Sequence, residues 1–303
     1  MVPQPTLAGL HVVFARCAES SRAPSALSAA GVPWTVVQKG GVRCNSSRAA
    51  ARAARSGLGD AQRHHVKWLA HNRGDECAAY LEWIVDRYDD LPELTAFVQF
   101  GAERQLIGSE LPTSLRMVVG RARELGYTAL SRHSFQGAWP APCEPAAKQR
   151  VFANCSAALW RRLEPTRPTA PRALRFYANG LFVASRARIR SRPRALYAEL
   201  AERLAGRQPS LCDVPDTRAH PPAQRSRLVG DCHLLEKTWH ILLGEPAVMP
   251  AAQKYDRARA PHTTSGGLPA PRIGGRFVGD AGKCRQADAA ADAALEALAS
   301  LSS

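Results

Sequence analysis

Apolar positions recur along the first 245 residues with two different periods, and each period predicts one kind of element. Short β-branched and aromatic runs are typical of buried strands, and they occupy residues 10–15, 34–38 and 95–100. Apolar residues three and four apart predict helices, over residues 77–88, 112–126, 147–163, 193–204 and 231–243. Because strands alternate with helices, the pattern predicts an α/β fold: a mostly parallel twisted sheet with helices on both faces.

The segments between these elements have weaker patterns. Residues 43–62 predict a variable loop or a frayed helix, and the aromatic, proline-rich residues 134–145 predict a loop. Residues 175–184 are strand-like with a glycine kink. We therefore expect a single domain over 8–245, followed over 246–303 by a Pro/Gly-rich tail with a short terminal helix.

The strongly basic composition invites a nucleic-acid interpretation, which the residue types do not favour. The formal net charge is +15, but only six of the 41 basic residues are Lys, and the Arg- and Ala-rich runs are typical of GC-rich codon usage. Stacking aromatics, which single-strand binders need, are not interleaved with the basic clusters. We expect no specific nucleic-acid partner. Apolar runs fall far short of the ~20 residues of a membrane span, so no transmembrane segment is expected in this chain.

Eight cysteines are scattered without a C-x-x-C pair, so the sequence does not favour a zinc ribbon. Their even number permits disulfides, but Cys77 falls on the apolar face of the helix over 77–88 and is interpreted as a buried thiol. The first residues lack the pattern of a signal peptide. Two glycosylation sequons, at Asn45 and Asn154, leave the secretory pathway open, and the compartment stays unknown.

Residues 71–101 form a loop, helix, turn and strand around which the other elements are arranged. A polar loop with Asn72 and Gly74 leads into the helix, and Glu76 lies in its first turn. Ligands of α/β sheets sit beyond the carboxyl ends of the strands. Gln99 and Glu103, at the end of the strand over 95–100, are therefore expected at a ligand site.

Four blocks of this sequence resemble a family of unknown function found in fungi, algae and bacteria. They are N-x-G-x-E with Y-L from Asn72 on, Y-D-x-L-P-x-x-T with F-x-Q up to Gln99, V-x-S-R-x-x-I-R-S-R-P-R over 183–194, and L-E at 235–236. The chain departs from the family pattern at Asp75, where members carry Arg, and at Phe100, which stands before the glycine expected after Gln99.

The G-x-x-V-x-S-R turn of this family is similar to one in nucleotide-sugar glycosyltransferases of the GT-A fold. That resemblance implies a nucleotide sugar or glycan as partner and Glu236 as catalytic base, with an ion-pair role for Glu236 as the alternative. It also implies substrate binding by Asn72, Gly74, Glu76, Gln99, Ser185, Arg186 and Arg190. The arginines would hold a diphosphate, since guanidinium groups bind phosphate oxygens bidentately. Asn72, Gln99, Arg186 and Glu236 are then expected to open onto one pocket.

Metal use is left open. No D-x-D pair follows the strand over 95–100, so Mg²⁺ or Mn²⁺ lacks its usual ligands in such transferases, and no metal ligand is assigned. His233, Glu236 and His240 share a helix face, but they do not form H-E-x-x-H and chance placement is the better interpretation. The alternative function is a non-catalytic carbohydrate- or protein-binding module on the same scaffold.

Overall fold

A computed structural model describes residues 6–17, 23–40, 66–69, 75–108, 110–132, 134–138, 146–167, 169–171, 173–211 and 231–249. The chain divides into two compact units. Unit 1 comprises Met1–Ser131 and Asn179–Ser210, and unit 2 comprises Arg132–Ala178 and Leu211–Ser303. The single domain expected over 8–245 and the tail over 246–303 stay predictions, and residues 250–303 lie outside the described part.

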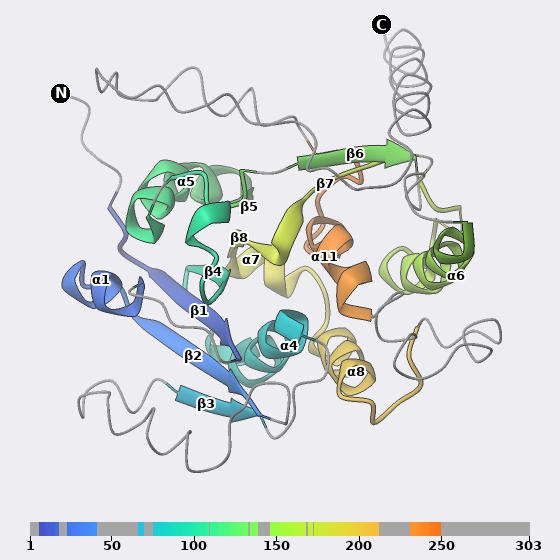
Figure 1. Cartoon of the computed structure of the whole chain (residues 1–303), viewed down its shortest axis with the longest axis horizontal. Helices are drawn as coiled ribbons and strands as arrows, with labels where there is room; N and C mark the ends of the chain where they lie inside the picture. Colours follow the sequence, from blue (N-terminus) through green and yellow to red (C-terminus); the bar gives the residue numbers. More distant parts are fainter. Residues whose placement is uncertain are drawn as a thin grey trace, which may run out of the picture. The chain divides into compact units, whose positions relative to one another are not determined.

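Unit 1 contains a six-stranded sheet with the order β3-β2-β1-β4-β8-β5 (Figure 1). Its strands are β1 (Leu10–Arg16), β2 (Trp34–Lys39), β3 (Val66–Leu69), β4 (Leu94–Gln99), β5 (Tyr127–Ala129) and β8 (Phe182–Ser185). β1 pairs in parallel with β2 and β4, and β2 with β3. β8 is antiparallel to both its neighbours, so that β5 runs in the direction of β4. The expected α/β class with a mostly parallel sheet is confirmed, although the sheet is mixed.

Helices cover both faces of this sheet, as expected. Alternate residues of β1 and β4, including Phe14 and Val98, share one buried cluster with α1 (Ala23–Ala29) and α5 (Leu111–Leu125). On the other face, Trp83 of α4 (Asp75–Arg87) stacks on His11 with ring centroids 5.6 Å apart. The period of two in the strands and of 3.6 in the helices thus supplies two apolar layers around one sheet.

Two predictions about the middle of the chain are wrong. The strand expected over 175–184 is two strands, β7 (Ala173–Tyr177) and β8, separated by the 3-10 turn η4 (Ala178–Gly180). Asn179 adopts a φ of 70° and Gly180 a φ of 54°. This left-handed backbone cannot continue a strand, so the chain leaves one sheet and enters another. The loop expected over 134–145 begins with a strand, β6 (Ser134–Ala138).

Unit 2 pairs β6 with β7 in an antiparallel ribbon and adds two helices. These are α6 (Ala146–Leu163) and α11 (Asp231–Leu242), and α11 packs against α6 and β7. Leu159 of α6 and Trp239 of α11 are each 1% exposed. Among the described helices of either unit, none is long and apolar enough to cross a membrane.

The interpretation of Cys77 as a buried thiol is wrong in part. Its side chain is fully buried, as the apolar spacing indicates. It is nevertheless disulfide-bonded, as are Cys17, Cys155 and Cys232. Periodicity assigns a residue to a helix face but does not show which cysteine the fold brings to it, so the bond could not be inferred from spacing.

Candidate functional site at the β1–β4 edge

The strand order of unit 1 reverses between β1 and β4. From β1 the chain adds β2 and β3 on one side, and β4 then joins on the other side of β1. In open α/β sheets, such a switch point leaves a crevice outside the carboxyl ends of the two central strands, because their connections leave toward opposite faces. Arg16 ends β1 and Gln99 ends β4, so this edge holds the residues expected to meet a ligand.

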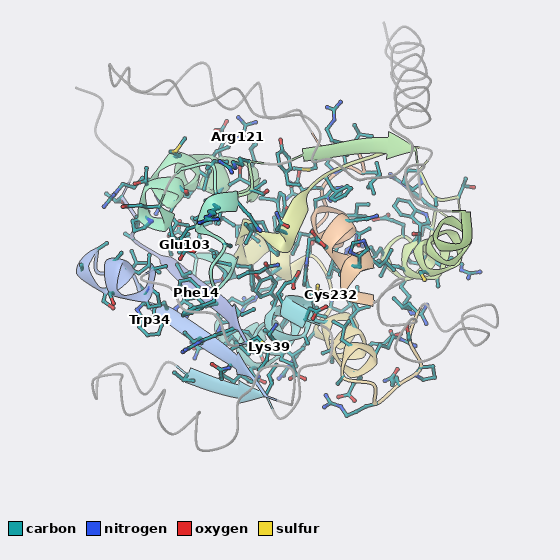
Figure 2. All side chains as sticks on the ribbon, in the orientation of Figure 1. Phe14, Trp34, Lys39, Glu103, Arg121 and Cys232 are labelled. Atoms are coloured by element: carbon teal, nitrogen blue, oxygen red, sulfur yellow. The ribbon has the colours of Figure 1, made fainter. Side chains whose placement is uncertain are left out.

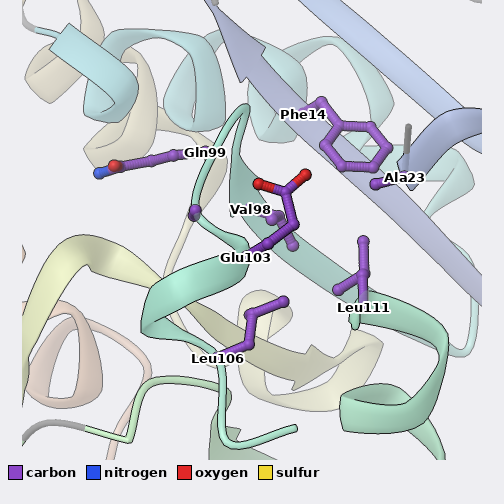
Figure 3. Close-up of a pocket in the computed structure, with 8 residues that line it drawn as sticks. Phe14, Ala23, Val98, Gln99, Glu103, Leu106 and Leu111 are labelled. Carbon is purple, nitrogen blue, oxygen red and sulfur yellow. The ribbon is translucent and has the colours of Figure 1, made fainter. Parts of the chain in front are cut away.

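A hollow lies at this switch point. Phe14 and Val98 line it from the two strands, Ala23 from α1 and Leu111 from α5, and Glu103 contributes a carboxylate (Figure 3). Its empty volume is about 170 Å³, open mouth included. Ligand pockets usually measure about 300–1,000 Å³, and this hollow has no space wide enough for a water molecule, so in this conformation it is too small to hold a ligand.

Gln99 and Glu103 contribute differently to this edge. The Gln99 side chain points away from Phe14 and Leu111, whereas the Glu103 carboxylate lies on the Phe14 side of its loop (Figure 3). Gln99 Nε2 donates a hydrogen bond to the Asn179 carbonyl at 3.0 Å. Gln99 thereby ties the end of β4 to the turn that precedes β8. Glu103, in the 3-10 turn η3 (Glu103–Gln105), is the acidic group beside the hollow.

Two cations end the strands on this edge. The Arg16 guanidinium lies 5.1 Å from the centre of the Phe100 ring, on the face that carries the hollow. Lys39 ends β2 and is 7% exposed (Figure 2). Gln38 fixes the neighbouring backbone, because its Nε2 donates to the Cys17 carbonyl at 2.7 Å. Arg16 directly follows an apolar strand in the sequence, a signal that could have placed it among the site residues.

Of the predicted entry loop, only Glu76 can be placed. Asn72 and Gly74 lie outside the described residues. Glu76 lies in the first turn of α4, a helix that follows the parallel strand β3 and so begins at the carboxyl edge of the sheet. Asp75, just before it, has a φ of 43°, a left-handed conformation that is uncommon outside glycine. The role of Glu76 in binding stays a prediction.

Ser185, Arg186 and Arg190 lie at the opposite edge of the sheet. β8 runs antiparallel to β4, and its last residue, Ser185, pairs with Leu94, the first residue of β4. Five residue steps separate Leu94 from Gln99, about 17 Å along the strand. The expectation that Gln99 and Arg186 open onto one pocket is therefore wrong. A diphosphate bound beside the hollow is out of reach of Arg186 and Arg190.

The residues at that opposite edge hold the ends of neighbouring elements. Ser185 caps α7 (Arg186–Arg190), since its hydroxyl accepts a hydrogen bond from the Arg188 N–H at 3.2 Å. Arg188 donates to the Leu125 carbonyl at the end of α5, at 3.1 and 3.3 Å. Arg190 donates to the Asp89 carbonyl at 2.8 Å. Guanidinium groups at helix carboxyl ends satisfy carbonyls that lack an intrahelical donor.

Glu236 belongs to unit 2. It is partly buried on α11, and its carboxylate lies 3.6 Å from His233 Nδ1. His240, one turn further, is buried, and its Nε2 lies 3.2 Å from the Ala247 carbonyl. Burial lowers the pKa of His240 to about 4, so the ring is neutral at pH 7. The ligand atoms of His233, Glu236 and His240 do not gather within 4.8 Å of one another, which leaves these described residues without the geometry of a metal site.

Together the fold and the edge define an α/β protein with a crevice at a topological switch point, walled by apolar side chains and flanked by Arg16 and Glu103. The chain belongs to the family described as Protein of unknown function (DUF3431), whose match covers residues 58–257. No curated protein and no solved structure gives a match. The expected membership of a family of unknown function is thus confirmed, and the likeness to GT-A transferases stays a proposal.

Proposed function

We propose that unit 1 binds a nucleotide sugar at the β1–β4 edge and acts as a glycosyltransferase-like domain. The observation that carries this proposal is the switch point between β1 and β4 in a mostly parallel sheet. Doubly wound sheets with the order 3-2-1-4 bind nucleotides at this crevice, because helix starts and strand ends face it together. The G-x-x-V-x-S-R turn that resembles GT-A transferases supports the class of ligand but not its place, since Ser185 lies at the opposite edge of the sheet.

The residues at this edge offer groups that suit the parts of such a ligand. Apolar side chains such as Phe14 and Leu111 are buried and would meet a flat ring only after the hollow widens, and the half-buried Arg16 guanidinium suits a diphosphate. Glu103 suits sugar hydroxyls or a cation, since Mg²⁺ is commonly held by one or two carboxylates together with substrate phosphates. This assignment replaces the Arg186 and Arg190 diphosphate clamp with Arg16.

Ligand-dependent stabilisation tests this proposal. UDP, GDP and their sugar conjugates, each with and without Mg²⁺ or Mn²⁺, are added at rising concentration while the melting temperature is followed. A ligand that binds only the folded state stabilises it by about 2.7 kcal/mol at 100 times its Kd. Arg16→Met should remove most of the shift, since methionine keeps apolar bulk and loses the cation. Glu103→Gln should weaken the dependence on metal.

Arg186→Met is the matched control, since it removes an exposed arginine from the opposite edge. It should leave the nucleotide shift unchanged. A shift lost with Arg186→Met and kept with Arg16→Met would move the phosphate site to the other edge. If no nucleotide or nucleotide sugar shifts the wild-type chain, the proposal is refuted and the non-catalytic carbohydrate- or protein-binding module is preferred.

Turnover separates an enzyme from a binding module. Transfer needs a base that takes the proton of the acceptor hydroxyl, and the resemblance to GT-A transferases implies Glu236 of unit 2 for this role. Glu236→Gln should keep nucleotide binding and lower the rate of sugar-nucleotide hydrolysis by roughly 10²–10⁴. A wild-type rate in this variant would assign Glu236 to its contact with His233 instead.

A further inference from the structure

The edge opposite the hollow carries a concentration of arginines. α4, continued by η2 (Tyr88–Asp90), and α5 both end at this edge, and β8 delivers the chain to α7 beside them. Six arginines gather there, and we call them the amino-edge arginine surface: Arg123, Arg186, Arg188, Arg190, Arg192 and Arg194.

Several of these arginines are held in place by backbone carbonyls. Arg188 is bonded to the Leu125 carbonyl, and Arg190 to the Tyr88 and Asp89 carbonyls at 3.2 and 2.8 Å. A guanidinium has five N–H donors, so one or two carbonyl contacts leave donors directed outward. Side chains fixed in this way lose little conformational entropy when they bind a second group. Arg188 and Arg190 are therefore preorganised for anions.

Acidic groups neutralise only part of this surface. Arg194 pairs with Asp89 at 3.3 Å, and Arg123 with Glu93 at 3.1 Å. Among the described residues no ion pair joins a carboxylate to Arg186 or Arg190, so these two guanidiniums are surplus positive charges, and the nearby Arg87–Asp90 ion pair adds no net charge. Arg186 is exposed, and among the described residues its guanidinium makes no hydrogen bond or ion pair.

Arg186 and Arg190 stand four residues apart on α7 and are both exposed. Side chains at this spacing share a helix face, with Cβ atoms about 5–6 Å apart. Two planar guanidinium groups at this distance can each bind one of two neighbouring sulfate, phosphate or carboxylate groups on the same polymer. The surplus charge and the spacing together indicate a polyanionic partner rather than a single small ion.

The described side chains around the surface also indicate which class of polyanion it binds. Two aromatic rings lie beside the surface: Tyr197 is buried, and Tyr88 is half-buried and donates its hydroxyl hydrogen bond to the Arg192 carbonyl at 2.6 Å. The surface therefore lacks the exposed stacking rings of single-strand nucleic-acid binders. Met117 and Leu125 are the large apolar side chains exposed among the described residues, too few for the apolar face that a membrane-surface helix inserts.

Oxidised cysteines add an independent indication. Cys17 and Cys77 of unit 1 are disulfide-bonded, and disulfides persist in oxidising compartments outside the cytosol, where acidic polysaccharides rather than nucleic acids are abundant. We propose that the amino-edge arginine surface binds an anionic polysaccharide, whose sulfate, phosphate or carboxylate groups contact Arg186 and Arg190. This inference does not depend on nucleotide binding at the other edge.

The test measures the affinity of the chain for heparin and polygalacturonate. Neutral dextran, poly-glutamate and a single-stranded DNA of matched charge are measured as comparison ligands. The wild-type chain should bind both acidic polysaccharides with a Kd that rises roughly tenfold between low and physiological salt, as counterions are released. Arg186→Glu should weaken binding by roughly tenfold, since an exposed ionic contact is worth up to about a factor of five and reversal adds repulsion.

Arg104→Glu is the control, because it makes the same charge change on an exposed arginine of η3 at the opposite edge. It should change the affinity less than twofold. Equal losses in the two variants would show binding by net charge alone and overturn the proposal. Tighter binding of DNA or poly-glutamate than of either polysaccharide would overturn the choice of partner. Arg186→Glu should keep the wild-type melting temperature, so a loss of binding cannot be attributed to unfolding.

Discussion

His240 makes the stability of unit 2 depend on pH. Burial lowers the pKa of this ring from 6.5 to about 4, against a smaller opposing effect of the hydrogen bond to the Ala247 carbonyl. The unfolded chain therefore binds a proton between these two pH values that the folded unit does not. The contribution of neutral His240 is fully present above pH 6.5, and it is lost as the pH falls from 6.5 to 4.

The size of the effect follows from the two pKa values. Each pKa unit corresponds to 1.36 kcal/mol, so a fall from 6.5 to about 4 gives about 3 kcal/mol in the free energy of unfolding. Most of this should be lost by pH 4.5. Urea unfolding at pH 7, 5.5 and 4.5 measures it, with tryptophan fluorescence as the signal, to which the neighbouring buried Trp239 contributes.

His240→Gln separates this group from the carboxylates that titrate in the same range. Glutamine can donate to the Ala247 carbonyl but takes up no proton, so the variant should lose about 3 kcal/mol less than the wild type between pH 7 and 4. His233→Gln, which removes a partly exposed histidine of the same helix, should keep the full fall. Parallel curves for the wild type and His240→Gln would refute the reasoning.

Three further outcomes are expected for stability. Tyr197→Phe should destabilise unit 1 by about 0.5–1.5 kcal/mol in urea, because the Ile189 carbonyl loses its hydroxyl donor at 2.8 Å and keeps only the Arg192 and Ser191 backbone N–H groups; an unchanged midpoint would contradict this. Arg188→Met should lower the melting temperature slightly and more than Arg186→Met, since only Arg188 caps the Leu125 carbonyl. Reduction with dithiothreitol should lower the free energy of unfolding by about 2–4 kcal/mol for each disulfide broken, including the one that Cys77 forms. Equal unfolding curves before and after reduction would exclude a structural role for the disulfides.

The sequence by itself determined the elements whose causes are local. Apolar residues at helical spacing placed α4 and α5, and a β-branched, aromatic run placed β4, each within two residues of its observed bounds. The alternation of these elements along the chain was enough to predict the α/β class, because few layer arrangements bury both amphipathic helices and apolar strands. The end of β4 was likewise recognisable as the carboxyl edge of a parallel strand, and Gln99 and Glu103 lie beside the hollow there.

Only the tertiary structure decided how distant segments are oriented. The direction of β8 depends on Asn179 and Gly180, whose left-handed backbone breaks an apparently continuous strand and sends it back along β4. Nothing in the local pattern of β8 distinguishes a parallel from an antiparallel partner, since both bury the same alternate side chains. That one choice carried Arg186 and Arg190 to the edge opposite Gln99, and the same limitation hid the disulfide of Cys77. Periodicity specifies which side of an element is buried, and pairing across the chain specifies what that side meets.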